Sequence, residues 1–81
     1  MAISLHPDPT DVLAWFDGAV DGKELFANVK SLRSDPNWRV QFVPSPNLWD
    51  ITLVYWPTGK RYMVRLEPLR GSHNTLWHRT A

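Results

Sequence analysis

The spacing of the apolar residues changes once along the chain, near Trp38. Before this point apolar residues recur every three or four positions, as on one face of a helix, and after it they recur every second position, as on one face of a strand. Helices followed by strands typically form one helical layer on an antiparallel sheet. We therefore predict an α+β fold, in which one or two N-terminal helices pack on one face of a three- to four-stranded antiparallel sheet.

Two helix starts precede the change of spacing. Asp8 is a good N-cap residue and is followed by Pro9, which the first helical position tolerates. The apolar stripe after it comprises Val12, Leu13, Phe16, Ala19 and Val20. A second acidic cap at Asp21 precedes a stripe formed by Leu25, Phe26, Val29 and Leu32. Because the helical spacing breaks between the stripes, the pattern predicts two short helices, or one kinked helix, ending near Arg33.

Strict alternation of apolar and polar residues predicts three strands over residues 38–43, 49–56 and 61–66. The first two are separated by Pro44-Ser45-Pro46-Asn47, where proline removes backbone donors. The next turn, Pro57-Thr58-Gly59-Lys60, contains a glycine that is free to adopt a positive φ. Residues 75–79 fit a short fourth strand at an edge of the sheet.

Length and composition predict one domain and limit its chemistry. A chain of 81 residues is long enough for one core, so we treat residues 1–81 as a single small α+β domain. It has no cysteine that could form a disulfide or a thiolate metal site. We find no signal peptide and no run of about 18 apolar residues that would span a membrane. These features predict a cytoplasmic protein without membrane contact.

The net charge of +1 conceals an uneven distribution along the chain. Residues 1–37 carry three basic and six acidic side chains, a net charge of −3, whereas residues 38–81 carry six basic and two acidic ones, a net charge of +4. Such a split can steer a charged partner, although it also arises easily in a small domain. The isoelectric point near 8.2 lies below the value of about 9 that is usual for nucleic-acid-binding domains.

The alternation also assigns side chains to the two faces of the sheet. One face is almost wholly apolar and is expected to lie under the helices: Trp38, Val40, Phe42, Trp49, Ile51, Leu53, Tyr62, Val64 and Leu66. The other face comprises Arg39, Gln41, Asp50, Thr52, Trp56, Arg61, Met63 and Arg65. This second face is expected to be uncovered, with arginines beside an aromatic ring.

The five tryptophans divide into two groups. Trp15, Trp38 and Trp49 are expected in the core, where a few large rings can fill much of a small interior. Trp56, beside a proline, and Trp77, near the C-terminus, are expected to be exposed. The predicted partner-binding residues are therefore Trp56, Arg61, Arg65, Arg39 and Trp77.

No segment carries a pattern of known catalytic chemistry. His73 and His78 are five positions apart and lack a third metal ligand at a convincing spacing. Asp50 and Glu67 are better explained as ion-pair partners of arginine than as an acid/base pair. We therefore predict no enzyme activity, no catalytic residue, no metal and no cofactor.

The leading hypothesis is a small non-enzymatic module that binds a larger protein or protein complex. Trp and Arg are enriched in interface hot spots, and a small bacterial or phage protein often acts by adhering to a host machine. We expect an inhibitor of the phage or mobile-element type that occludes its partner sterically. The alternatives are a single-stranded nucleic-acid binder using the same face, an accessory subunit of an enzyme complex, and an ordinary solvated face. The sequence leaves the oligomeric state open, with a homodimer as one option.

Overall fold

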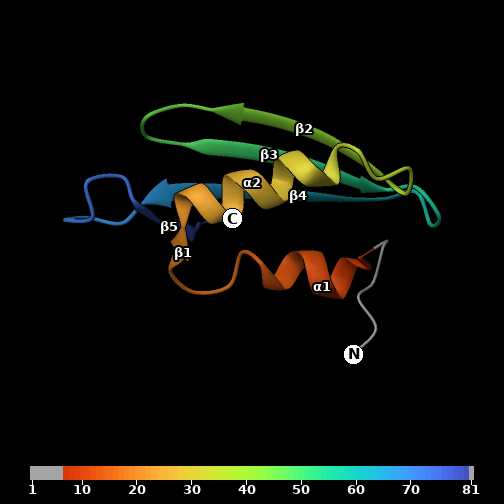
Figure 1. Ribbon diagram of the computed structural model, residues 1–81, viewed down its shortest axis with the longest axis horizontal. Coiled ribbons are helices and arrows are strands. Elements are labelled where there is room, and N and C mark those ends of the chain that lie inside the picture. Colours follow the sequence, from red (N-terminus) through yellow and green to blue (C-terminus); the bar gives the residue numbers. More distant parts are fainter. Residues whose placement is uncertain (1–6, 81) are drawn as a thin grey trace.

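A computed structural model describes residues 7–80 as two helices and one antiparallel sheet (Figure 1). In chain order the elements are α1 (Pro9–Ala14), β1 (Val20–Asp21), α2 (Gly22–Leu32), β2 (Trp38–Pro44), β3 (Trp49–Tyr55), β4 (Lys60–Pro68) and β5 (Leu76–Arg79). The predicted α+β class, the N-terminal helices and the antiparallel sheet are confirmed. The predicted number of strands is wrong, because the sheet within residues 7–80 has five strands rather than three or four.

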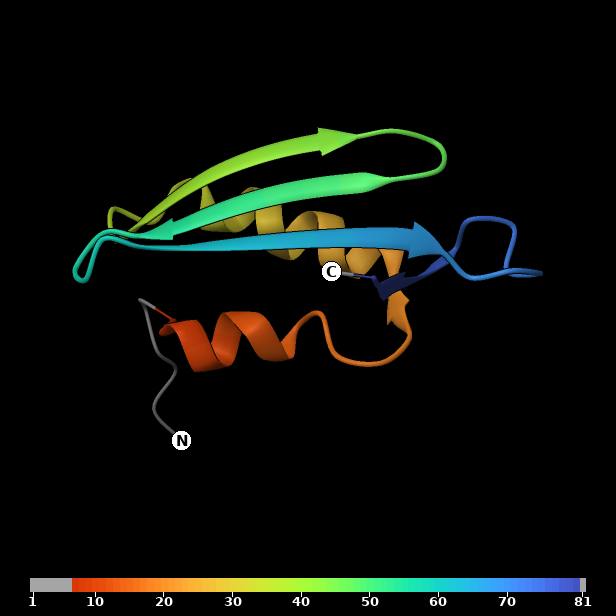
Figure 2. The same cartoon turned by 180° about the vertical axis from the view of Figure 1, so that it is seen from behind.

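The strand order in the sheet is β1-β5-β4-β3-β2. β2, β3 and β4 pair along nearly their whole lengths, from Trp38 opposite Tyr55 to Trp49 opposite Leu66. On one side β5 pairs with the end of β4, and on its other side it pairs with the two residues of β1. A long three-stranded meander is therefore extended at one end by two short strands (Figures 1 and 2).

Both helices begin at the aspartates that the sequence indicates. The backbone N–H of Asp11 donates to the Asp8 carboxylate at 2.9 Å, and the N–H of Asp8 donates back to the Asp11 carboxylate at 3.4 Å. At α2, the Asp21 carboxylate accepts from the N–H groups of Lys23 at 2.8 Å and Glu24 at 3.2 Å. These contacts satisfy N–H groups that have no partner inside a helix.

The first helix is shorter than the apolar spacing predicts. α1 ends at Ala14, and Gly18 with φ +66° turns the chain away from the helical path. Val20 then pairs with Trp77 as part of β1. The prediction that Val20 belongs to a helix is wrong, because pairing with a distant strand outweighs the local pattern.

The core lies between the apolar inner face of the sheet and the helices, as predicted. α2 crosses this face behind β3 and β4 in Figure 2, and α1 and the turn after it contribute Val12 and Phe16 to the same cluster. The buried core residues are Val12, Phe16, Leu25, Val29, Leu32, Trp38, Ile51, Leu53, Val64, Leu66 and Trp77. Of the tryptophans expected in the core, Trp38 is buried, whereas Trp15 and Trp49 are half-buried and pack against it.

The prediction that Trp77 is exposed is wrong. Its side chain is 3% exposed and stacks on Trp49 with ring centroids 4.1 Å apart and an interplanar angle of 20°. The indole Nε1 donates to the Asn74 carbonyl at 3.1 Å. β5 lies between β4 and β1 instead of fraying at an edge, so Trp77 is held on the inner face and is removed from the candidate binding residues.

Gly22 allows the start of α2 to approach this buried indole. A Cβ atom at position 22 would lie 2.8 Å from Nε1 and 2.9 Å from Cδ1 of Trp77. We expect Gly22→Ala to lower the free energy of unfolding by about 1–2 kcal/mol, because overpacking outweighs the gain in helix propensity. Urea denaturation would measure the loss, and Ser31→Ala on the exposed side of α2 should change stability by less than about 0.5 kcal/mol. A Gly22→Ala protein as stable as the native one would contradict this packing.

Candidate functional site

The outer face of β2, β3 and β4 is the surface that lies opposite α2. Figure 2 looks onto it, and no helix passes in front of these three strands. We define the outer face as Arg39, Gln41, Val43, Asp50, Thr52, Val54, Trp56, Arg61, Met63 and Arg65. The structure therefore brings four of the five predicted binding residues onto one side of the sheet, and Trp77 lies on the other.

The strand register arranges this face in three cross-strand rows. From β2 through β3 to β4 the rows are Arg39–Val54–Arg61, Gln41–Thr52–Met63 and Val43–Asp50–Arg65. In the first row two arginines flank a valine, so the backbones that carry them are about 10 Å apart. Only the third row places an arginine directly opposite a carboxylate.

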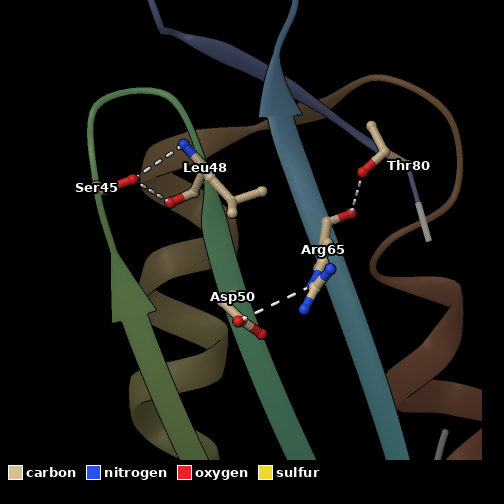
Figure 3. A network of polar contacts seen from close by, with 5 residues as sticks. All are labelled: Ser45, Leu48, Asp50, Arg65 and Thr80. Carbon is tan, nitrogen blue, oxygen red and sulfur yellow. Dashed lines mark hydrogen bonds and ion pairs between the residues drawn. The ribbon is translucent and has the colours of Figure 1, made fainter.

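The ion pair in the third row is weak. Arg65 Nε lies 3.9 Å from Asp50 Oδ2, and the two side chains are 52% and 38% exposed (Figure 3). Exposed pairs of this kind contribute less than about 1 kcal/mol. Arg39 and Arg61 form no ion pair with any residue in the described range 7–80. The interpretation of these arginines as ordinary paired surface charges therefore fits Arg65 alone.

Short polar contacts hold the end of the outer face that carries this pair. The Ser45 hydroxyl donates to the Leu48 carbonyl at 2.6 Å, which closes the loop between β2 and β3. The Thr80 hydroxyl donates to the Arg65 carbonyl at 3.4 Å (Figure 3), and the Thr80 N–H donates to the same carbonyl at 2.8 Å, so β4 is supported from its other side. These contacts keep the third row in a defined position.

Trp56 is exposed, as predicted, and is nevertheless held in place. Its side chain is 60% exposed, while its backbone N–H donates to the Asn37 carbonyl at 2.7 Å. The guanidinium carbon of Arg39 lies 4.8 Å from the centre of the indole ring. This cation–π contact restricts the conformations of both side chains.

Apolar side chains complete the outer face. Met63 is 56% and Val43 is 55% exposed. A shallow pocket of about 340 Å³ lies among the strands, and Thr52, Val54 and Met63 are among the residues that line it. The alternation of residues in the sequence places Met63 on this face. Its exposure could not be derived from that alternation, because it depends on the absence of any covering element within residues 7–80.

A second concavity on the inner side was missed by sequence analysis. It has a volume of about 530 Å³ and is lined by Asp21, Gly22, Lys23, Phe26, Trp49, Asn74, Thr75 and Trp77. Its most polar group, the Asp21 carboxylate, already caps α2. The spacing of residues in the sequence does not predict this pocket, because Trp49 and Trp77 come into contact only through the order of the strands in the sheet.

In comparisons with known proteins, no family model, curated protein or solved structure matches the chain. Within residues 7–80, no three His, Asp or Glu side chains are grouped so that they could hold a metal ion. None of the helices in this range is long and apolar enough to cross a membrane. The functional interpretation therefore depends on the outer face itself.

Proposed function

We propose that this protein is a small non-enzymatic binding module that attaches to a larger protein through its outer face and blocks that partner sterically. The observation that carries the proposal is Trp56, an exposed indole that Arg39 holds in position on an uncovered sheet. Exposed Met63 and Val43 add apolar surface farther along the same face, in its second and third rows. Trp, Met and Arg are the residue types enriched at the centres of protein interfaces.

The chemistry of the face indicates what the partner presents. Trp56 needs an apolar pocket, and Arg39 and Arg61 need carboxylates, since neither forms an ion pair within residues 7–80. The shallow pocket that Thr52 and Val54 help to line has room for a side chain of the partner. A phage- or mobile-element-type inhibitor would act by occupying such a surface without any chemistry of its own.

Single-stranded nucleic acid is the second candidate, and it is favoured by arginines beside an exposed indole. Three features of the same face oppose it: Asp50 carries negative charge, Arg65 is partly engaged by that carboxylate, and Val43 and Met63 expose apolar side chains. Two unengaged arginines would supply few phosphate contacts, and affinity for nucleic acid grows with their number. A protein partner therefore fits the face better, and an accessory subunit of an enzyme complex would use the same contact.

Charge reversal at Arg61 tests the proposal. The immobilised native protein should retain a protein partner from a nuclease-treated lysate of its native cell, and Arg61→Glu should lose it. With the purified partner, Arg61→Glu should weaken affinity by about 2 kcal/mol, roughly 30-fold, because repulsion replaces a charge pair. Isothermal titration calorimetry measures this loss. The matched control is Arg70→Glu, an equal change of charge in the exposed turn after β4.

Two results would contradict the proposal. Capture that survives in Arg61→Glu and Trp56→Ala alike would place the contact elsewhere on the protein. If nuclease treatment abolishes capture of the partner, and the protein binds oligonucleotides with an affinity that falls steeply with salt concentration, the function would be nucleic-acid binding instead.

A further inference from the structure

β2 is the end strand of the sheet, so one of its long edges is free. It pairs only with β3, over the seven residues Trp38–Pro44, and no strand within residues 7–80 lies on its other side. Figure 1 shows β2 at the margin of the sheet, with α2 crossing below it. An edge of this kind is a template for pairing with another extended chain.

Two hydrogen bonds that bracket the β2–β3 ladder reveal which backbone groups face the free edge. The Trp56 N–H donates to the Asn37 carbonyl at 2.7 Å, and the Ser45 N–H donates to the Leu48 carbonyl at 3.0 Å. Hydrogen-bonded pairs alternate along an antiparallel ladder, so the odd-numbered residues of β2 bond to β3. The backbone groups of the even-numbered residues therefore point away from the sheet.

The free edge presents donors at two positions. Val40 and Phe42 each offer an N–H and a carbonyl, and no backbone group within residues 7–80 hydrogen-bonds to them on this side. At the ends of the strand, the Trp38 N–H already donates to the Asp35 carbonyl at 3.1 Å, and Pro44 has no N–H. The alternating donors and acceptors in between are what an added β-strand requires.

Basic side chains flank this edge. Phe26 of α2 lies beside β2, with its ring 5.4 Å from that of Phe42. Lys30 and Arg33 follow Phe26 at positions i+4 and i+7, so they lie on the same flank of the helix. The opposite flank carries Glu24, Asn28 and Ser31, so the cations are on the β2 side. Both are exposed, and neither forms an ion pair within residues 7–80.

The other side of β2 is also basic, because Arg39 projects from the outer face without a carboxylate partner in residues 7–80. Asp35, the nearby acid before the strand, accepts from the Asn37 N–H at 2.8 Å and is engaged in helix-end structure. A chain added along this edge would therefore meet positive charge from both faces of the sheet. Phe26, which is 41% exposed, would supply apolar contact.

We propose that the free edge of β2 binds an extended acidic segment of a partner protein as a sixth strand. A second copy of this chain fits less well, because β2 contains no carboxylate and edge-to-edge pairing would bring the Lys30 and Arg33 flanks of two copies together. A nucleic acid lacks the peptide pattern of donors and acceptors. Successive side chains of the added strand point to opposite faces, so acidic side chains on its outer face would meet Arg39 and those on its inner face would meet the α2 cations.

This site goes beyond the proposed function, since it uses the backbone edge of β2 and shares only Arg39 with the outer face. Strand addition would extend the contact beyond the outer face.

Amide hydrogen exchange of the native protein, followed by NMR, tests the inference. The probe is a blocked seven-residue peptide of alternating valine and glutamate. In the free protein, the amides of Arg39, Gln41 and Val43 should be protected and those of Val40 and Phe42 should exchange rapidly. Saturating peptide should slow exchange at Val40 and Phe42 by at least about tenfold, because these N–H groups become hydrogen-bonded. The same peptide with lysine in place of glutamate should give no protection.

Variants separate the two components of the site. Val40→Pro removes an N–H donor that faces solvent, so it should abolish strand addition. The variant is expected to fold, since proline is tolerated on that side of an edge strand. Should this variant fail to fold, the double variant Lys30→Glu/Arg33→Glu, which changes only exposed side chains, should weaken peptide binding by about tenfold or more. Arg70→Glu is the matched charge control and should bind normally. Arg61→Ala, which lies on β4 and two strands away from this edge, should also bind the peptide normally, which keeps this result distinct from failure of the proposed function.

Four outcomes would overturn the inference. Protection of Val40 and Phe42 in the dilute free monomer would show that the chain covers its own edge. Protection that rises with protein concentration, together with a dimeric mass, would assign the edge to a second copy. Equal binding of the lysine peptide would remove the role of the cations. Protection by a thymidine oligonucleotide and not by the acidic peptide would assign the site to nucleic acid.

Discussion

Replacing Trp77 with alanine is expected to lower the free energy of unfolding by about 3–5 kcal/mol. The indole is 3% exposed, stacks on Trp49 at 4.1 Å and donates to the Asn74 carbonyl at 3.1 Å. Removing it leaves a cavity between β3, β5 and the start of α2, and also removes one of the hydrogen bonds that hold the preceding turn. Since small domains are stable by only about 5–15 kcal/mol, a large part of the folded population would be lost.

Urea denaturation followed by far-ultraviolet circular dichroism measures this effect. The matched control is Trp56→Ala, which removes the same side chain from a position that is 60% exposed and should cost less than about 1 kcal/mol. A Trp77→Ala protein within about 1 kcal/mol of the native one would show that β5 does not pack under α2. That result would also restore Trp77 as a candidate contact residue.

Trp56→Ala is expected to weaken the complex with the partner by about 2–4 kcal/mol, roughly 30- to 1,000-fold, while leaving the fold intact. The loss is large because the ring is the largest exposed apolar group on the outer face and is already ordered by Arg39. Arg39→Ala should lose part of the same energy, since it removes the group that orients the indole. The two losses are therefore expected to be less than additive.

A double-mutant cycle by isothermal titration calorimetry, with the partner identified by capture, tests this coupling. Arg65→Ala provides the comparison, because its weak ion pair with Asp50 lies in another row and it should combine additively with Trp56→Ala. Unchanged affinity in the Trp56→Ala/Arg65→Ala double variant would remove the outer face from the contact. Strict additivity of Trp56→Ala with Arg39→Ala would show that the cation–π pair plays no part in it.

The main layers of the fold follow from the spacing of apolar residues. The change near Trp38 predicts helices before strands, and alternation correctly separates the buried inner side chains, such as Ile51 and Leu53, from those on the outer face. Of the two short strands, β5 was predicted as a strand but at an edge of the sheet, and β1 was not predicted. β1 has only two residues, too few for a periodic signal, and its pairing with β5 is a contact between distant parts of the chain.

The spacing also predicts on which side of the sheet most residues of the candidate site lie. Alternation places Arg39, Arg61 and Arg65 on one side, because each lies in a strand with a clear period of two. It does not reveal which arginine pairs with a carboxylate or stacks on Trp56, since both depend on register and on side-chain geometry. The free edge is also invisible in sequence, because it depends on which strand ends the sheet.

The pairing of Val20 with Trp77 joins positions separated by 57 residues (77 − 20). Closing so long a loop costs entropy before the contacts form, whereas the hairpins that connect β2, β3 and β4 are short. The meander is therefore expected to assemble first during folding, and β1 and β5 should dock afterwards. Until they dock, the face of Trp49 that Trp77 covers stays open to solvent, which makes this late step the stage at which the chain is most prone to aggregation.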